Sequence, residues 1–174
     1  MNANKPVLTV VGCDPGLANL GLGAVRETGR DVTWLGSELL RTSARRPLQQ
    51  RLSYLHEGVR TFLSTHRPDA LAIEGQYFHQ QRETAFKVGQ AVGVTLLAAA
   101  EFGIEVFEYG PMQVKQTLVG SGRADKGQVL YMVRALLGPD TAGLSHHAGD
   151  ALALALTHLS ARRLSAAAVH GASR

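Results

Sequence analysis

Acidic side chains end two of the most apolar stretches of this chain. The run "VLTVVGCD" ends on Asp14, and the run "ALAIE" ends on Glu74. In "SHHAGDALALAL", His147 and Asp150 lie three residues apart, so they share one face of the helix that this segment predicts. Neighbouring carboxylates repel each other unless a cation lies between them, and hard divalent ions such as Mg²⁺ and Mn²⁺ prefer oxygen ligands. The four residues therefore predict a site for one or two metal ions.

A site of this kind suits phosphodiester hydrolysis. Two ions about 3.5–4 Å apart can stabilise both the attacking and the leaving oxygen of the displacement. Each residue also has an ordinary structural interpretation. Asp14 alone fits a turn or a helix cap, Glu74 alone fits a surface position, and His147 with Asp150 fits the first turn of a helix. The metal-site interpretation rests on all four falling at matching places in one topology.

The elements that must position these residues are indicated by the period of the apolar residues. Short apolar runs joined by turn-rich links predict strands, and spacings of three and four predict helices. The predicted strands cover 7–13, 20–26, 32–40, 70–74 and 104–109. One predicted helix begins at Pro47, and four others cover about 82–102, 112–118, 126–137 and 146–163.

This order predicts an α/β fold with a five-stranded mixed sheet, three antiparallel plus two parallel strands, flanked by helices. The first and fourth strands would lie side by side and parallel. Asp14 and Glu74 would then meet at the edge of the sheet where open α/β sheets form their sites. A length of 174 residues suits one domain, which we expect over 1–164, with a disordered tail at 165–174.

The composition, 45% hydrophobic and 18% charged with a formal net charge of +4, is typical of a folded protein and permits nucleic acid binding. The single cysteine, Cys13, lies in an apolar run and is expected in the core. One cysteine alone excludes a disulfide framework and a cysteine-based zinc site. The longest apolar run, 91–100, is too short to cross a bilayer, and the first residues do not resemble a signal peptide. We therefore expect a cytoplasmic protein with no membrane partner.

The histidines do not suggest a zinc site. His146 and His147 are adjacent, so their side chains point about 100° apart around a helix. The remaining histidines lack ligand spacing and are expected at the surface. They are His56, His66, His79, His158 and His170.

Five segments, in order, resemble the RuvC family of Holliday junction resolvases over about residues 8–160. They are "GCDPGLANLGLG", "LAIEGQYF", "FKVGQAVGV", "FEYGPMQVKQTLVGSGRADKGQV" and "HHAGDALALALTH". The resemblance implies a ribonuclease H-like fold, dependence on Mg²⁺ or Mn²⁺, and a homodimer that nicks two opposed strands of a four-way DNA junction. It also implies 5′-phosphate and 3′-hydroxyl products, a role in recombination and DNA repair, and partnership with RuvA and RuvB.

By the same resemblance, Asp14, Glu74 and Asp150 are metal-binding carboxylates. His147 stands where many members carry an aspartate and others a histidine, and it serves either as a ligand or as a proton shuttle. A nitrogen ligand lowers the negative charge of the cluster and is softer than oxygen. We therefore expect Mn²⁺ to be accepted at least as well as Mg²⁺.

The resemblance also implies DNA contacts. Tyr77 falls where the family places an aromatic residue near the junction crossover, and Phe78 is a second candidate for stacking on a base. Either ring could instead pack on the core, and each basic residue could be a solvated surface charge. The remaining candidates for DNA contact are Gln76, Arg82, Lys115, Arg123 and Lys126, of which Arg123 lies in a glycine-rich loop without P-loop spacing.

Ala85, Gly89 and Gly93 form a stripe of small residues that would let another helix approach closely. The resemblance implies a dimer contact there, and packing within one subunit is the alternative.

Two other functions also remain open. "DPGLANLGLG" is similar to the phosphate-binding hairpin of sugar-kinase and actin-like proteins, although those proteins duplicate the fold. The first alternative function is therefore nucleotide binding, and the second is binding of DNA junctions without catalysis.

Overall fold

The fold comes from a computed structural model, which describes residues 7–75 and 82–171. Its elements include five strands and five α-helices. In chain order they are β1 (Val7–Asp14), β2 (Asn19–Thr28), β3 (Asp31–Arg41), α1 (Leu48–His66), β4 (Ala70–Glu74), α2 (Arg82–Glu101), β5 (Glu105–Tyr109), α3 (Pro111–Val119), α4 (Lys126–Leu137), the short 3₁₀ helix η1 (Pro139–Thr141) and α5 (His146–Gly171).

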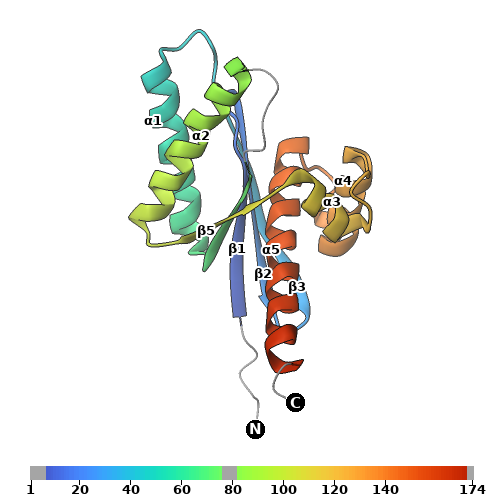
Figure 1. Cartoon of the computed structure of the whole chain (residues 1–174). Coiled ribbons are helices and arrows are strands. Elements are labelled where there is room, and N and C mark those ends of the chain that lie inside the picture. Colours follow the sequence, from blue (N-terminus) through green and yellow to red (C-terminus); the bar gives the residue numbers. More distant parts are fainter. Residues whose placement is uncertain (1–6, 76–81, 172–174) are drawn as a thin grey trace.

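The five strands form one sheet in the order β3-β2-β1-β4-β5. The pairs β1–β2 and β2–β3 are antiparallel, whereas β4 runs parallel to both β1 and β5. Figure 1 shows α1 and α2 on one side of this sheet, and α5 on the other side with α3 and α4 beyond it. The predicted mixed sheet flanked by helices is therefore confirmed.

The alternation of side chains along β1 divides the core into two layers. Val11 and Cys13 pack in the cluster that the sheet forms with α1 and α2, and Val10 packs in the cluster with α5. Cys13 is fully buried, as predicted, and this burial raises the pKa of its thiol to about 12. Residues at even positions of β1 thus face α5, which sets the direction of Asp14 at the end of the strand.

The C-terminal helix is longer than predicted. α5 continues to Gly171, where the sequence predicted its end at 163 and a disordered tail from 165. The segment after Leu164 is rich in alanine, the strongest helix former, and a helix already nucleated by a buried first half extends at little cost. An ion pair between Arg163 and Glu27 ties this part of α5 to β2.

The surface position predicted for His158 is wrong, because this side chain is only 1% exposed. Its Nδ1 lies 2.7 Å from the Tyr109 hydroxyl, and its ring packs on Phe107 with 4.4 Å between centroids. His158 therefore joins α5 to β5 inside the core. The sequence signal was its place on the core-facing side of an uninterrupted apolar helix. Of the other four histidines, His56 and His66 are half-buried, and the side chains of His79 and His170 lie outside the described residues.

We expect His158 to make stability fall as the pH drops below about 6.5, the ordinary pKa of histidine. Burial lowers the pKa of His158, and the positive charge of Arg162 adds to this shift. The unfolded chain then binds a proton that the folded chain does not, so the free energy of unfolding decreases with falling pH. Urea unfolding at pH 7.5 and 5.5 checks this, with His158→Gln as the control that cannot titrate. Equal losses in both proteins would contradict it.

Among residues 7–75 and 82–171, no helix is long and apolar enough to cross a membrane.

Candidate active site

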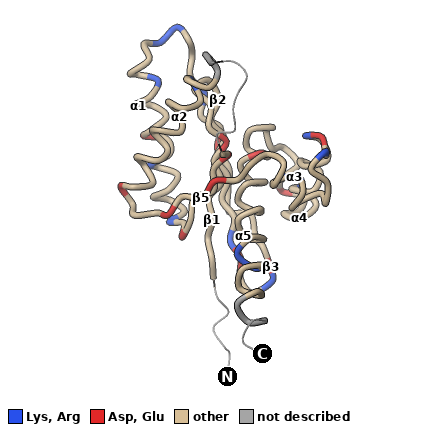
Figure 2. The backbone as a smooth tube through the Cα atoms, in the orientation of Figure 1, with Lys and Arg blue, Asp and Glu red and all other residues tan. Residues whose placement is uncertain are grey.

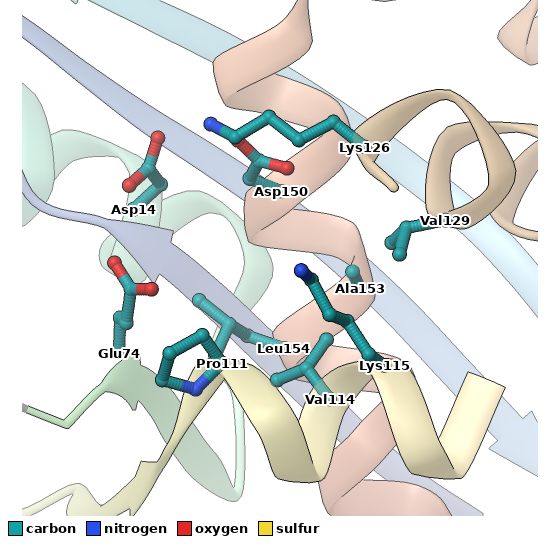
Figure 3. Close-up of a pocket in the computed structure, with 10 residues that line it drawn as sticks. All are labelled: Asp14, Glu74, Pro111, Val114, Lys115, Lys126, Val129, Asp150, Ala153 and Leu154. Carbon is teal, nitrogen blue, oxygen red and sulfur yellow. The ribbon is translucent and has the colours of Figure 1, made fainter. Parts of the chain in front are cut away.

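Asp14 and Glu74 are the last residues of the neighbouring parallel strands β1 and β4. The register pairs Cys13 with Ile73, so the two carboxylates follow at the same level of the sheet. Cys13 and Ile73 both pack toward α1 and α2, and side chains alternate along a strand. Asp14 and Glu74 therefore point to the opposite face, where α5 lies, and Figure 3 shows both carboxylates turned toward the same space.

Glycines in β1 and β2 let α5 lie directly on the sheet. A Cβ atom at Gly12 would be 1.8 Å from the Ala151 carbonyl oxygen, and one at Gly21 would be 2.2 Å from the His147 carbonyl oxygen. Only glycine permits this approach. This close approach was not predicted from the sequence, although Gly21 and Gly23, with the apolar Leu22 between them, were a usable signal. The close packing brings the start of α5, with His147 and Asp150, to the edge that holds Asp14.

Three carboxylates line one cavity of about 110 Å³ between the sheet, α3, α4 and α5 (Figure 3). They belong to Asp14, Glu74 and Asp150, and two of the predicted DNA-contacting lysines, Lys115 and Lys126, line the same cavity. The rest of the wall is apolar. It consists of Pro111, Val114, Val129, Ala153 and Leu154.

Two of the carboxylates have basic partners within the chain. His147 Nδ1 lies 2.7 Å from Asp14 Oδ2, and Lys126 Nζ lies 3.5 Å from Asp150 Oδ2. Lys126 is the first residue of α4, whose start is fixed by a capping box between Asp125 and Gln128. The position of the lysine ammonium beside the cavity therefore follows from local sequence.

Burial raises the pKa of the Asp14 carboxyl. The hydrogen bond from His147 opposes this shift, the negative charge of Asp150 adds to it, and the charges of His147 and Lys126 oppose it again. Desolvation is the largest of these effects. Ionised Asp14 is thus held in an environment where an additional cation would be stabilising.

The donor set suits a hard divalent cation, since three carboxylates from three elements surround one cavity. Within the described residues, however, no three His, Cys, Asp or Glu side chains converge tightly enough to enclose an ion. The pairs Asp14–His147 and Asp150–Lys126 are in place there instead. The structure thus brings the three acids to one cavity and joins His147 to Asp14, while their roles as ligands stay a prediction.

Arg123 is the one further predicted DNA-contacting residue whose side chain the structure describes. Arg123 is exposed in the loop between α3 and α4. Arg82 begins α2, but its side chain lies outside the described residues, as do Gln76, Tyr77 and Phe78.

The stripe of small residues on α2 faces away from the rest of the described chain. Ala85 is half-buried, and Gly89 and Gly93 are exposed. A Cβ atom at either glycine would meet no heavy atom within 4 Å in the part of the chain that the structure describes. Within residues 7–75 and 82–171, neither glycine packs against another helix, and the dimer contact stays a prediction.

The fold defines the class of protein, a domain with the ribonuclease H-like fold. The yeast mitochondrial Holliday junction resolvase Ydc2 has this fold with a TM-score of 0.62 at 12% identity, over 91% of this chain and 82% of its own. At that identity the likeness concerns the fold alone.

The family model described as crossover junction endodeoxyribonuclease RuvC matches residues 10–158. The RuvC of Thermus thermophilus is 46% identical over 154 residues, which are 87% of this chain and 93% of that protein. The RuvC of Rubrobacter xylanophilus is 43% identical over 165 residues, 95% of this chain and 92% of that protein. The structure of T. thermophilus RuvC in complex with Holliday junction substrate has a TM-score of 0.86 at 45% identity, over 91% of this chain and 96% of that one. This chain belongs to the RuvC family.

Proposed function

We propose that this chain is an endonuclease that resolves four-way DNA junctions by nicking two opposed strands, leaving 5′-phosphate and 3′-hydroxyl ends. The observation that carries the proposal is the cavity that holds Asp14, Glu74 and Asp150 beside two lysines, in a member of the RuvC family. A relative with 45% identity has been solved with a Holliday junction substrate. An intact set of acids favours catalysis over a binding module that lacks it.

Asp14, Glu74 and Asp150 would hold one or two divalent ions, Mg²⁺ or Mn²⁺. A bound ion supplies Lewis-acid activation and neutralises charge on the phosphate. His147 would complete the ligand set or accept a proton, since its ring is already hydrogen-bonded to Asp14.

Lys115 and Lys126 would orient the phosphate that enters the cavity. Both ammonium groups lie at the cavity in Figure 3, and Lys126 is largely exposed, with 79% of its side chain accessible. An exposed lysine paired with Asp150 could exchange this partner for a phosphate oxygen by side-chain rotation alone, since its stem is flexible. The apolar residues that line the rest of the cavity would limit the water that reaches the reacting group.

The experiment that tests this function is a nicking assay on a mobile four-way junction with each strand labelled in turn. We expect paired, symmetric nicks that require Mg²⁺ or Mn²⁺, and no nicks in linear duplex of the same sequence. Junction binding without nicking in either metal would favour the non-catalytic module. ATP binding by calorimetry, without junction binding, would favour the nucleotide-binding alternative.

Symmetric nicking needs two cavities, and we propose that a homodimer formed through α2 supplies them. The outer side of α2 carries the exposed glycines 89 and 93 together with Phe86 and Leu97, which are 70% and 54% exposed. An apolar stripe interrupted by glycines suits close packing against a second copy of the same helix. RuvA and RuvB are the further partners that we propose from family membership.

We expect Gly93→Arg to convert the dimer into a monomer, because a long charged side chain would occupy the space that the partner helix needs. Its dimer dissociation constant should rise by at least about 100-fold, equivalent to about 2.7 kcal/mol. Light scattering coupled to size-exclusion chromatography measures the mass. Ala135→Arg, at an exposed position on α4, is the matched control and should leave the mass unchanged. A dimeric Gly93→Arg variant would refute this interface.

A further inference from the structure

A second cavity, of about 260 Å³, lies where β3 ends and α1 begins. Three arginines line it, accompanied by uncharged polar side chains and one aromatic ring, with no aspartate or glutamate among the lining residues. The lining consists of Arg41, Thr42, Ser43, Arg46, Gln50, Arg51 and Tyr54. Such a lining is suited to an anion that accepts several hydrogen bonds.

The three arginines differ in how they are held. Arg51 is fixed, since its Nε donates to Thr42 Oγ1 at 2.9 Å and its Nη2 donates to the Leu17 carbonyl oxygen at 3.3 Å. Arg41 and Arg46 are exposed and have no side-chain hydrogen bond or ion pair to any residue in 7–75 or 82–171. Two guanidinium groups thus remain available beside a third that is already oriented.

The start of α1 adds to the positive potential of this cavity. The helix has 19 residues, its N-cap is Pro47, and neither a capping side chain nor an acidic residue lies in its first turn. The partial positive charge of the helix N-terminus is therefore not offset locally. Figure 2 shows Lys and Arg residues, drawn in blue, on the loop that leads into α1.

The basic cavity lies at the same end of the sheet as the acidic one. The register pairs Asp14 with Gly21, and Gly21 with Leu39, two residues before Arg41. Strand spacings of about 4.8 Å and a rise of about 3.3 Å per residue place the Cα atoms of Asp14 and Arg41 on the order of 12 Å apart. The turn between β1 and β2 connects the two cavities. It follows Asp14, which lines the acidic cavity, and its Leu17 carbonyl oxygen accepts a hydrogen bond from Arg51, which lines the basic cavity.

We propose that this cavity binds a backbone phosphate of the DNA substrate, at a position other than the phosphate cleaved at the acidic cavity. The planar guanidinium fork matches the geometry of the non-bridging phosphate oxygens. Binding to phosphate orients a DNA strand without reading its sequence. A bound strand would then be fixed at two points, one in each cavity. This inference rests on the proposed function for the identity of the anion.

The test compares the double variant Arg41→Gln/Arg46→Gln with Arg45→Gln. Arg45 is exposed on the same loop but does not line the cavity, so Arg45→Gln controls for the loss of one nearby positive charge and is matched to the single variant Arg46→Gln. Junction affinity is measured without divalent metal between 50 and 250 mM salt. The slope of log affinity against log salt should decrease by about 0.9 for each phosphate that the variant no longer neutralises, with affinity at 100 mM salt lower on the order of tenfold. Arg45→Gln should match the wild type.

Methylphosphonate substitution along the junction strands locates the bound phosphate. A neutral phosphate at that position should weaken the wild type and leave the double variant unaffected. If unfolding midpoints show that the double variant is unstable, the single Arg46→Gln variant is used instead. Wild-type affinity and salt slope in the variants would overturn the inference. Binding of free phosphate alone would also overturn the inference. In that case inorganic phosphate would raise the wild-type melting temperature, while the double variant would keep the wild-type affinity for junctions.

Because affinity is read without cleavage, the two proposals can fail separately. A wild-type protein that does not nick junctions but shows the expected affinity loss in the variant would refute the nuclease and retain the phosphate site. Normal nicking with unchanged affinity in the variant would refute the phosphate site alone.

Discussion

Asp14→Asn is expected to bind four-way junctions with wild-type affinity and to cleave them on the order of 10³-fold more slowly. Asparagine keeps the size of the side chain and can still hydrogen-bond to His147, whose Nδ1 lies 2.7 Å from the carboxylate. It removes the negative charge that the proposed ion needs, and metal-ion catalysis contributes several kcal/mol to the transition state. Single-turnover cleavage with Mg²⁺ and with Mn²⁺, and affinity in EDTA, are the measurements.

The same variant should be at least as stable as the wild type. Burial raises the pKa of Asp14, so its charge disfavours the folded state, and the nearby Asp150 adds to that effect. A neutral side chain removes this cost. Asp31→Asn is the control: it makes the same change at an exposed position, at the opposite end of the sheet where Asp31 pairs with Thr28, and should leave cleavage unchanged. Cleavage of junctions at the wild-type rate by purified Asp14→Asn would refute the assignment of this site.

Gly12→Ala is expected to destabilise the protein by about 3 kcal/mol or more and to abolish cleavage. The added methyl group would lie 1.8 Å from the carbonyl oxygen of Ala151 and 3.0 Å from the amide nitrogen of Ala155. Both are backbone atoms of α5, so no side-chain rotation relieves the clash, and overpacking of this kind costs about 1–3 kcal/mol even where the surroundings adjust. Because Asp150 precedes Ala151, a displaced α5 also carries this carboxylate away from Asp14.

Gly149→Ala is the graded comparison for this prediction. Its Cβ would lie 2.5 Å from Leu130 Cδ1, the end of a flexible side chain that can move, and alanine favours the helix by about 1 kcal/mol over glycine. We expect a much smaller change in the urea unfolding midpoint than for Gly12→Ala. If both variants unfold at the wild-type midpoint and cleave normally, the close packing of α5 on the sheet does not hold the active site.

Local sequence was sufficient to predict the elements and the ends that carry the acids. The alternation between short apolar runs and helical spacing predicted the strand 70–74 and the helix 126–137 with the bounds that the structure has. Strand ends are marked by the change from apolar to polar residues, so Asp14 and Glu74 could be placed without any tertiary information. The resemblance to the RuvC family rests on the same short segments, and the family match extends over residues 10–158.

Contacts between distant segments were not predictable, because residues far apart in the chain leave no periodic signal in each other's sequence. The hydrogen-bond partner of His158, Tyr109, lies 49 residues away. The end of α5 was misplaced because its alanine-rich segment is exposed and lacks the apolar period that marked the rest.

The sequence by itself thus determined which residues carry charge at the ends of which elements. Only the tertiary structure decided their partners: His147 beside Asp14, Lys126 beside Asp150, and Arg41 with Arg46 and Arg51 around a second cavity. The physical reason is that a backbone propensity acts over a few neighbouring residues, whereas the position of a charged group depends on how closely whole elements pack. Here the glycines of β1 and β2 set that distance.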